Sequence, residues 1–339
     1  MRAIIQSRYG SSEVLTLAEV ERPTISHDEV LVSVAAAGLD RGTWHVMTGT
    51  PYLVRLGFGL RRPRNPVPGL DLAGTVVEVG AKVTGFAPGD EVMGIGKGSW
   101  AEFAAAPASK LLHRPVGLSA EQAAVVPVSG LTAVKAVRDA GQVTPGDQVL
   151  ILGASGGVGS YTVQLAKAMG AVVTATCSDA KRDFVHSLGA HHVYDYTHHD
   201  IAQITTKYDV IIDISGRHSL RTLRGALTPR GTLVLVGAEG GGGSWFGDFI
   251  PRALTATVLS SVFRQQIKVV VASEKATDLQ PLIELLAADQ LAPALERTFP
   301  LALASDAMRA FESGEVRGKV AILVRPIDPT ATNPTTALS

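Results

Sequence analysis

The first third of the chain alternates short apolar segments with turns rich in glycine and proline. From Met1 to about Pro127 these segments are MRAIIQ, EVLVSVAAAG, AGTVVEVG, DEVMGIG and AEFAAAP. Apolar runs of this length, closed by turn residues at this spacing, are typical of short β-strands in a barrel-like sheet. The pattern therefore predicts a β-rich first domain.

From about Leu131 the rhythm changes, and strand-like apolar runs alternate with helical segments. The predicted strands are QVLILGA, AVVTATCS, YDVIIDIS, TLVLVGA and QQIKVVVAS. The helical segments between or after them are GGVGSYTVQLAKAMG, AKRDFVHSLG, HSLRTLRGALTP and ATDLQPLIELLAADQ. This alternation is the signature of a parallel sheet with helices on both faces. We predict a doubly wound α/β domain over residues 128–290.

After Leu291 the first pattern returns, with the strand-like APALERTFPL, the helical SDAMRAFESG and a final strand, KVAILVR. The chain is therefore expected to leave the first domain, build the second and come back, so that the first domain comprises residues 1–127 and 291–327. Two domains also fit a length of 339 residues. Residues 328–339 have no hydrophobic period and are predicted to form a disordered tail.

The charge balance and the cysteine count exclude several classes of function. Lys plus Arg and Asp plus Glu both number 31, so the total charge favours neither nucleic acid nor an anionic membrane as a partner. A small-molecule ligand is expected instead. Cys177 is the only cysteine, which excludes an internal disulfide framework and a zinc site built from several thiolates. With no signal-peptide pattern and no uninterrupted run of 18 apolar residues, we expect a cytoplasmic protein.

A glycine-rich turn stands between the strand QVLIL and the amphipathic helix that follows. Its predicted cofactor-binding residues are Ala154, Ser155, Gly156, Gly157, Val158 and Gly159. In this strand-turn-helix context Gly156 lets the backbone approach a dinucleotide diphosphate, and Gly159 lets the helix pack closely on the strand. Ala154 replaces one glycine of the usual pattern. A tight turn without a ligand is the alternative.

The end of the next strand selects the form of the cofactor. An acidic residue there would bind the ribose 2′-hydroxyl of NAD, but the register gives Ser178, with Asp179 slightly late and Lys181 and Arg182 after it. A hydroxyl and two cations suit the 2′-phosphate of NADPH, since charge-assisted hydrogen bonds contribute roughly 1.5–3 kcal/mol each. NADPH is the predicted cofactor. The alternatives are a solvated helix end, or NADH with Asp179 on its ribose.

The strand TLVLVGA carries Gly237 near its end, at the carboxyl edge of the predicted sheet, where ligands bind in open α/β folds. Gly237 is therefore predicted to contact the cofactor. The run from Gly240 to Gly243 is either a loop beside the nicotinamide or a plain flexible connection.

The order of these segments resembles that of the medium-chain dehydrogenase/reductase superfamily along nearly the whole chain. The matching segments are GLDRGTWHVMTGTPY, PVPGLDLAGTVVEVG, PGDEVMG, AEFAAAP, VSGLTA, LGASGGVGSYTVQLAKAMGA and RGKVAILV. More narrowly, the chain is similar to the zinc-independent quinone oxidoreductase-like branch. The resemblance implies an α/β protein in which a discontinuous GroES-like β-rich catalytic domain is joined to a Rossmann doubly wound parallel-sheet domain, with the active site between them.

The resemblance also implies that no zinc is bound. Where the zinc alcohol dehydrogenases of this superfamily carry cysteine and histidine ligands, this chain has Asp40 and Leu70, and the third ligand would fall near Pro127. A catalytic zinc takes three protein ligands, of which at most Asp40 is present. We therefore expect no metal site.

Several single residues match functional positions of the superfamily. Arg41 stands where a basic residue often faces the diphosphate, and Thr132 matches a threonine near the nicotinamide. His45 matches a proton-relay histidine of the zinc enzymes, where many quinone reductases carry tyrosine. His45, Asp40 and Tyr52 are the predicted catalytic residues, with Asp40 and Tyr52 helping to place the substrate.

Two further clusters of residues can be explained without a ligand. The pairs His191-His192 and His198-His199 suggest a metal, but adjacent residues of a strand face opposite ways, and the segment is predicted to be a surface connection. Arg55, Arg61, Arg62 and Arg64 either steer an anionic ligand or are solvated side chains of a proline-rich loop.

The predicted function is zinc-independent hydride transfer from NADPH to a quinone or an α,β-unsaturated carbonyl compound. Without zinc, an acceptor whose conjugation spreads the developing charge is favoured. The alternatives are an alcohol or aldehyde oxidoreductase and a cofactor-binding regulatory protein without turnover. QQIKVVVAS resembles an edge strand through which relatives pair, so a homodimer is expected.

Overall fold

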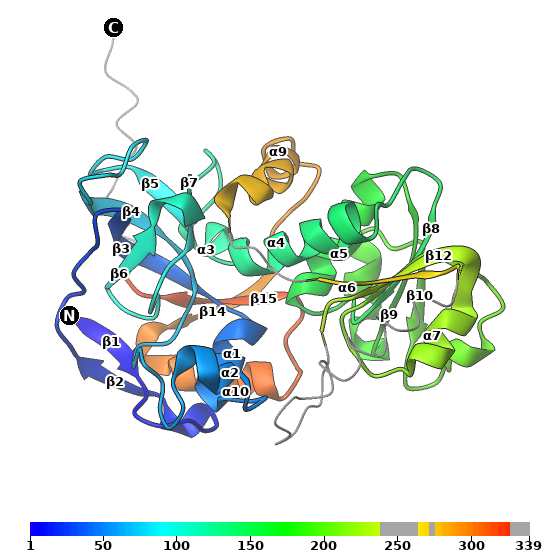
Figure 1. Ribbon diagram of the computed structural model, residues 1–339, viewed down its shortest axis with the longest axis horizontal. Coiled ribbons are helices and arrows are strands. Elements are labelled where there is room, and N and C mark those ends of the chain that lie inside the picture. The colour runs from blue at the N-terminus through cyan, green and yellow to red at the C-terminus, as the bar shows by residue number, and fades with distance from the viewer. Residues whose placement is uncertain (238–263, 271–274, 326–339) are drawn as a thin grey trace, which may run out of the picture.

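The computed structural model describes residues 1–237, 264–270 and 275–325. They form two lobes side by side, each built around its own sheet (Figure 1). The predicted tail at 328–339 and the glycine run Gly240–Gly243 lie outside the described residues.

The first lobe contains a mainly antiparallel sheet of seven strands. These are β3 (Glu29–Leu39), β4 (Asp71–Val79), β5 (Glu91–Ile95), β6 (Phe103–Pro107), β7 (Leu111–His113), β14 (Leu295–Pro300) and β15 (Lys319–Leu323). Their order is β14-β15-β3-β4-β5-β7, with β6 also paired to β3. β3 is buried along almost its whole length, which explains its continuous apolar sequence. A separate two-stranded sheet joins β1 (Arg2–Ile5) and β2 (Thr16–Glu19).

Short helices complete the first lobe. They are α1 (Arg41–Thr48), α2 (Val54–Phe58), α3 (Ala120–Ala123) and α10 (Ala304–Glu312). Ser119 and Gln122 form a reciprocal capping box at the start of α3, which satisfies two amide donors that the first helical turn leaves free. The strands β14 and β15 return the chain to this sheet after the second lobe is complete.

The second lobe contains a parallel sheet of six strands. They are β8 (Gln148–Leu152), β9 (Val172–Cys177), β10 (His192–Asp195), β11 (Tyr208–Asp213), β12 (Leu227–Leu235) and β13 (Gln266–Val269). The order β10-β9-β8-β11-β12-β13 is that of a Rossmann fold, and all neighbouring pairs are parallel. The direction of winding reverses between β8 and β11, and ligands bind at such switch points.

Helices α4 (Pro127–Val134), α5 (Gly157–Ala168), α6 (Arg182–Ser187), α7 (Leu220–Ala226) and α9 (Gln280–Ala287) surround this sheet. In Figure 1, α4 and α5 lie where the two lobes meet. One apolar core continues through the junction, since Ala36 and Met93 of the first lobe belong to the same buried cluster as Leu131 and Val149. The shared core fixes the cleft between the lobes.

The predicted fold class is confirmed by the two sheets. Among the described strands, β13, which contains part of QQIKVVVAS, lies at the end of the sheet order as expected, whereas the homodimer stays a prediction. The histidine-rich segment was wrongly assigned to a connection, because residues 192–195 form the edge strand β10. β12 begins at Leu227, earlier than its apolar run suggests. The domain boundaries at 127/128 and 290/291 stay predictions. No helix among the described residues is long and apolar enough to cross a membrane.

Candidate active site

A cavity of about 800 Å³ opens between the two lobes at the carboxyl edge of the parallel sheet. Residues after β8, β9, β11 and β12 form one wall, and α1, α4 and the segment before β15 form the other. Of the predicted site residues, those that line this cavity are Asp40, Arg41, His45, Thr132, Ser155, Gly156, Gly157, Val158, Ser178, Lys181 and Gly237. The predicted site residues Tyr52, Ala154, Gly159 and Arg182 do not line it.

The glycine-rich turn joins β8 to the N-terminus of α5 at the switch point. Gly153 has φ +88°, a conformation that favours glycine, and Gly156 is the extended N-cap of α5. A Cβ on Gly159 would lie 2.2 Å from the Gly153 oxygen, so this glycine is required for the close packing of helix and turn. A Cβ on Gly156 would meet only that same oxygen, at 3.8 Å, so Gly156 leaves space at the cavity wall. The turn thus offers free amides and room for an anion.

The end of β9 forms the part of the cavity that selects the cofactor. Ser178 and Lys181 line it, and Lys181 Nζ also donates to the carbonyl oxygens of Gly314 and Val316, at 2.6 and 2.7 Å. Lys181 therefore links the two lobes across the cavity. The Arg182 guanidinium instead pairs with Asp179 at 3.0 Å.

Sequence reasoning missed two residues in this region. Arg217 and Tyr196 line the same cavity as Ser178, with the Arg217 guanidinium 5.0 Å from the centre of the Tyr196 ring. Arg217 lies four residues after the end of β11, in the segment DISGR, so its position after a sheet strand could have indicated its role. Tyr196 lies just beyond the edge strand β10, whose assignment as a connection hid it.

The opposite end of the cavity is formed by α1. Asp40 is 3% exposed and caps this helix, because its two carboxylate oxygens accept hydrogen bonds from Thr43 N at 2.8 Å and Thr43 Oγ1 at 3.0 Å. Arg41 lies over the rings of Trp44 and Phe311. The geometry gives Asp40 a structural task, and its part in substrate placement stays a prediction.

His45 lies on the same helix, with its Nδ1 2.6 Å from the carbonyl oxygen of Thr50. A carbonyl oxygen can only accept, so Nδ1 carries a proton and the neutral ring has an acceptor at Nε2. Burial lowers the pKa of His45, and the Arg41 charge acts in the same direction. His45 is therefore neutral at neutral pH.

Of the remaining predicted residues, Thr132 lines the cavity and Tyr52 does not. The hydroxyl of Thr132 donates to the Val128 carbonyl oxygen at 2.8 Å, which fixes its rotamer at the cavity. Tyr52 is packed against Arg55, whose guanidinium lies 4.5 Å from the centre of its ring. Tyr52 does not line the cavity with His45, and its part in substrate placement stays a prediction.

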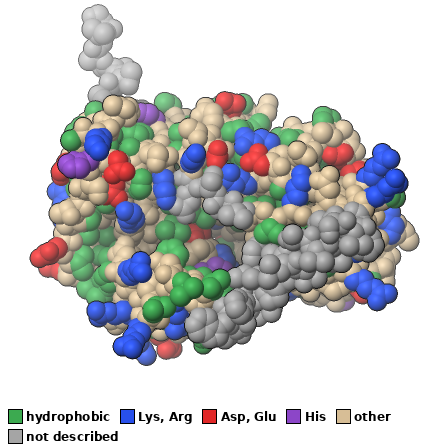
Figure 2. Space-filling model, viewed as in Figure 1, with side chains coloured by type: hydrophobic (Ala, Val, Ile, Leu, Met, Phe, Trp, Pro, Cys, Tyr) green, Lys and Arg blue, Asp and Glu red, His purple; other side chains and the backbone are tan. Residues whose placement is uncertain are grey.

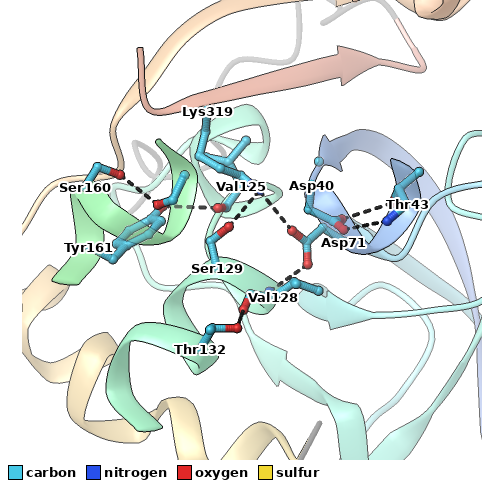
Figure 3. Close-up of polar contacts among 12 residues, drawn as sticks. Asp40, Thr43, Asp71, Val125, Val128, Ser129, Thr132, Ser160, Tyr161 and Lys319 are labelled. Atoms are coloured by element: carbon cyan, nitrogen blue, oxygen red, sulfur yellow. Dashed lines mark hydrogen bonds and ion pairs between the residues drawn. The ribbon is translucent and has the colours of Figure 1, made fainter. Parts of the chain in front are cut away.

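A buried polar network lies at the cavity edge, where three elements meet (Figure 3). Lys319 Nζ of β15 lies 3.1 Å from Ser129 Oγ of α4 and 3.5 Å from Asp71 Oδ2 of β4. Asp71 Oδ1 accepts a hydrogen bond from Val128 N at 2.8 Å. Burial raises the pKa of Asp71 to about 7, against the opposing effect of the Lys319 charge. Sequence reasoning missed this network.

Lys319 and Ser129 also contact the cofactor motif. A Cβ on Gly157 would lie 2.8 Å from Lys319 Cδ and 3.2 Å from Ser129 Oγ. Both side chains line the cavity, so a buried cation and a hydroxyl lie beside the first residue of α5. In the sequence, a lysine at the start of the apolar strand KVAILV could have indicated a buried, functional cation.

Members of both histidine pairs take part in hydrogen bonds within the fold. His198 Nδ1 lies 2.6 Å from Asp195 Oδ2, and His191 Nδ1 accepts from Val173 N at 3.0 Å. Across residues 1–237, 264–270 and 275–325, no three His, Cys, Asp or Glu side chains come together as metal ligands. Cys177 is buried, which raises the pKa of its thiol to about 11 and keeps it protonated.

Comparison with known proteins identifies the family. A family model described as "Alcohol dehydrogenase GroES-like domain" matches residues 26–116, and one described as "Zinc-binding dehydrogenase" matches residues 188–322. The "Chloroplast envelope quinone oxidoreductase homolog" of Arabidopsis thaliana is 31% identical over 95% of this chain and 98% of its own length. The chain belongs to the zinc-independent, quinone oxidoreductase-like branch of the medium-chain dehydrogenase/reductase superfamily.

Two further relatives are informative, one for the activity in its name and one for the cofactor in its structure. The "2-methylene-furan-3-one reductase" of Solanum lycopersicum is 35% identical over 71% of this chain and 66% of its own length. The structure of "mycobacterial Rv1454c complexed with NADPH" has a TM-score of 0.80 and 26% identity, covering 96% of this chain and 100% of its own. This medium-chain dehydrogenase/reductase is thus an oxidoreductase that binds NAD(P)H.

Proposed function

We propose that this enzyme transfers hydride from NADPH to a quinone or an α,β-unsaturated carbonyl compound. The observation that carries the proposal is one continuous cavity, which joins the glycine-rich turn at Gly156 to the wall formed by Thr132 and His45. The relatives named as quinone oxidoreductase and 2-methylene-furan-3-one reductase support this class of acceptor.

Residues that follow β9 and β11 favour NADPH over NADH. Ser178, Lys181 and Arg217 offer a hydroxyl and two cations to a 2′-phosphate, whereas Asp179 is paired with Arg182 and does not line the cavity. An ammonium group has three donors, so Lys181 can bind a phosphate and keep a carbonyl partner. Arg182, predicted to share this task, lies outside the cavity wall.

The diphosphate would lie at the start of α5. There the amides of Gly157 and Val158 are at a helix N-terminus, and the Lys319 side chain is adjacent. The Asp71 carboxylate holds Lys319 in place and offsets part of its charge. These contacts would set the depth at which the nicotinamide enters the cavity.

The donor set supports a reaction without zinc. At the positions where zinc-dependent relatives carry ligands, Asp40 is bound as a helix cap by Thr43, and Leu70 and Pro127 have no donor atom. Zinc would require three ligands. The acceptor must then carry its own means of spreading charge, which a quinone or an enone does by conjugation.

Bound NADPH would supply the hydride, and the protein would position the acceptor and control the proton. Thr132 would limit movement of the nicotinamide, while His45 would lie beside the reacting carbonyl. Because the neutral ring has a lone pair at Nε2, His45 delivers a proton only after it has taken one up. Low pH should therefore favour this role.

NADPH consumption against a panel of quinones, enones, aldehydes and alcohols tests the proposal. We expect turnover with quinones or enones and a preference for NADPH. Alcohol oxidation without quinone reduction would assign the zinc-free alcohol oxidoreductase instead. Tight NADPH binding with no consumption across the panel would assign the regulatory protein. A cytoplasmic location is part of the proposal.

A further inference from the structure

The segment from residue 42 to residue 70 contains four arginines and no aspartate or glutamate. The chain as a whole balances 31 positive against 31 negative side chains, so the total conceals a local excess of positive charge. Arg61, Arg62 and Arg64 are exposed to solvent. Arg55 is packed between the rings of Tyr9 and Tyr52, each 4.5 Å from its guanidinium.

Large apolar side chains are exposed within the same segment. Leu56, Phe58 and Leu60 are 55%, 45% and 66% exposed, and they are three of the eight large exposed apolar residues in the described ranges. Figure 2 shows hydrophobic side chains next to Lys and Arg side chains on the lower part of the viewed face, where Figure 1 places α1 and α2. Three such side chains within five residues form a local apolar surface.

Hydrogen bonds hold this surface in shape. Gly59 N donates to the Arg55 oxygen at 2.8 Å, and Arg64 N donates to the Phe58 oxygen at 2.7 Å, which closes the turn after α2. The Tyr9 hydroxyl donates to the Gly59 oxygen at 2.5 Å. The backbone is therefore braced on both sides of Leu60, and the apolar side chains are presented outward by a fixed turn.

The surface lies next to α1, a helix that forms part of the wall of the active-site cavity. α2 packs against α1, and α1 carries Arg41 and His45, which line the cavity. A flat partner that covered α2 would therefore lie close to the cavity.

We propose that residues 56–64 dock on an anionic lipid bilayer. Leu56, Phe58 and Leu60 enter the boundary between headgroups and acyl chains, while Arg61, Arg62 and Arg64 bind acidic headgroups. Apolar side chains flanked by arginine, without any acidic residue, have the composition of an interfacial membrane anchor. A protein partner needs roughly 800 Å² and 20–30 residues per side, which this nine-residue surface does not supply.

Docking would bring the enzyme to its acceptor, an argument that rests on the proposed function. Quinones and enones with hydrocarbon substituents dissolve in bilayers because burial of apolar surface is favourable. A bilayer-bound enzyme would meet such acceptors near the cavity, while NADPH would arrive from water.

Flotation with vesicles tests the proposal, using phosphatidylcholine with and without phosphatidylserine. We expect wild-type protein to float only with the anionic vesicles, and less as salt rises. Replacing Arg61, Arg62 and Arg64 with Gln should reduce binding roughly a hundredfold, at about fivefold per arginine. Replacing Leu56, Phe58 and Leu60 with Ser should also abolish flotation.

Matched controls separate this surface from general charge and apolarity. Exposed Arg221, Arg230 and Arg264 changed to Gln, or Val116 and Leu303 changed to Ser, should leave binding unchanged. Equal flotation of wild type and both surface variants, or no flotation at all, contradicts the proposal. A change in oligomeric state without lipid in the Leu56, Phe58 and Leu60 variant would assign the surface to a second copy of the chain instead.

The NADPH-binding affinity of each variant, measured by fluorescence in the absence of vesicles, shows whether it is folded. Flotation does not depend on turnover. If the proposed reaction is not observed, the flotation result still decides whether the surface binds lipid. Loss of lipid binding with NADPH affinity retained would confirm the surface.

Discussion

Lys319 Nζ lies 3.5 Å from Asp71 Oδ2, and the exposed fractions of the two side chains are 2% and 0%. This ion pair joins β15 to β4 within the first lobe, beside Ser129 and the start of α5. A charge that remains after its partner is removed is costly to bury.

The first prediction concerns this pair. At pH values well above 7, where the Asp71 carboxyl is ionised in the wild type, Lys319→Met should lower the free energy of unfolding by about 3–5 kcal/mol, because the buried carboxylate loses its partner. Asp71→Asn combined with Lys319→Met should recover part of that loss. Urea unfolding of the wild type, both single variants and the double variant measures the coupling. Additive losses would show that the pair does not interact.

The stability of Lys319→Met should also depend on pH. Burial raises the pKa of Asp71 from 3.8 to about 7, so the folded state holds a proton that the unfolded chain releases. Stability from this group is present below pH 3.8 and is lost as pH rises toward about 7. Without Lys319 the loss should be larger and extend to higher pH. A flat profile in urea unfolding would contradict this.

The second prediction concerns the glycine-rich turn. Gly156→Val should weaken NADPH binding, because a branched side chain would occupy the space at the diphosphate. The fold should persist, since a Cβ there meets only the Gly153 oxygen at 3.8 Å. Fluorescence titration measures the affinity and circular dichroism the fold. Unchanged affinity in a folded variant would make the motif a turn without a ligand.

The third prediction separates two neighbouring cations. Lys181→Ala should reduce NADPH affinity about ten- to a hundredfold and spare NADH, since one charge-assisted bond contributes roughly 1.5–3 kcal/mol. Arg182→Ala should change it by at most about fivefold, because this exposed side chain pairs with Asp179. Binding constants for both cofactors decide between them. A preference of the wild type for NADH would assign Asp179 to the ribose instead.

The fourth prediction concerns His45. His45→Ala should lower enone turnover by roughly ten- to a thousandfold and leave NADPH affinity nearly intact. Quinones should be affected less, because their oxygens can take protons from water. Burial lowers the pKa of His45 below 6.5, so its contribution as an acid should fall as pH rises through that lower pKa. Wild-type rates in the variant with every acceptor, at every pH, would make the histidine structural.

Features that depend on local backbone geometry could be predicted from the sequence. The turn from Gly153 to Gly159 could be assigned because a buried strand precedes it and an amphipathic helix follows, and the parallel sheet followed from the same alternation. Cys177 and Ser178 could be placed at a strand end for the same reason.

Side-chain direction and long-range pairing could not be predicted in this way. Lys181 and Arg182 are adjacent, but one lies at the end of a 3₁₀ turn and the other begins α6, so only Lys181 faces the cavity. Lys319 meets Asp71 only because β15 returns to the first sheet, and no local pattern records that contact. The contact of the Tyr52 ring with Arg55 likewise has no local signal in the sequence, and the part of Tyr52 in substrate placement stays a prediction.

The most direct test of the proposed reaction follows the hydride itself. Purified enzyme, kept in chelator, is incubated with NADPH deuterated at the reactive carbon of the nicotinamide and with an enone. We predict one deuterium at the β-carbon of the saturated product, at the same rate with and without chelator. Unlabelled product, reduction only of the carbonyl group, or activity that disappears with a chelated zinc would contradict the account.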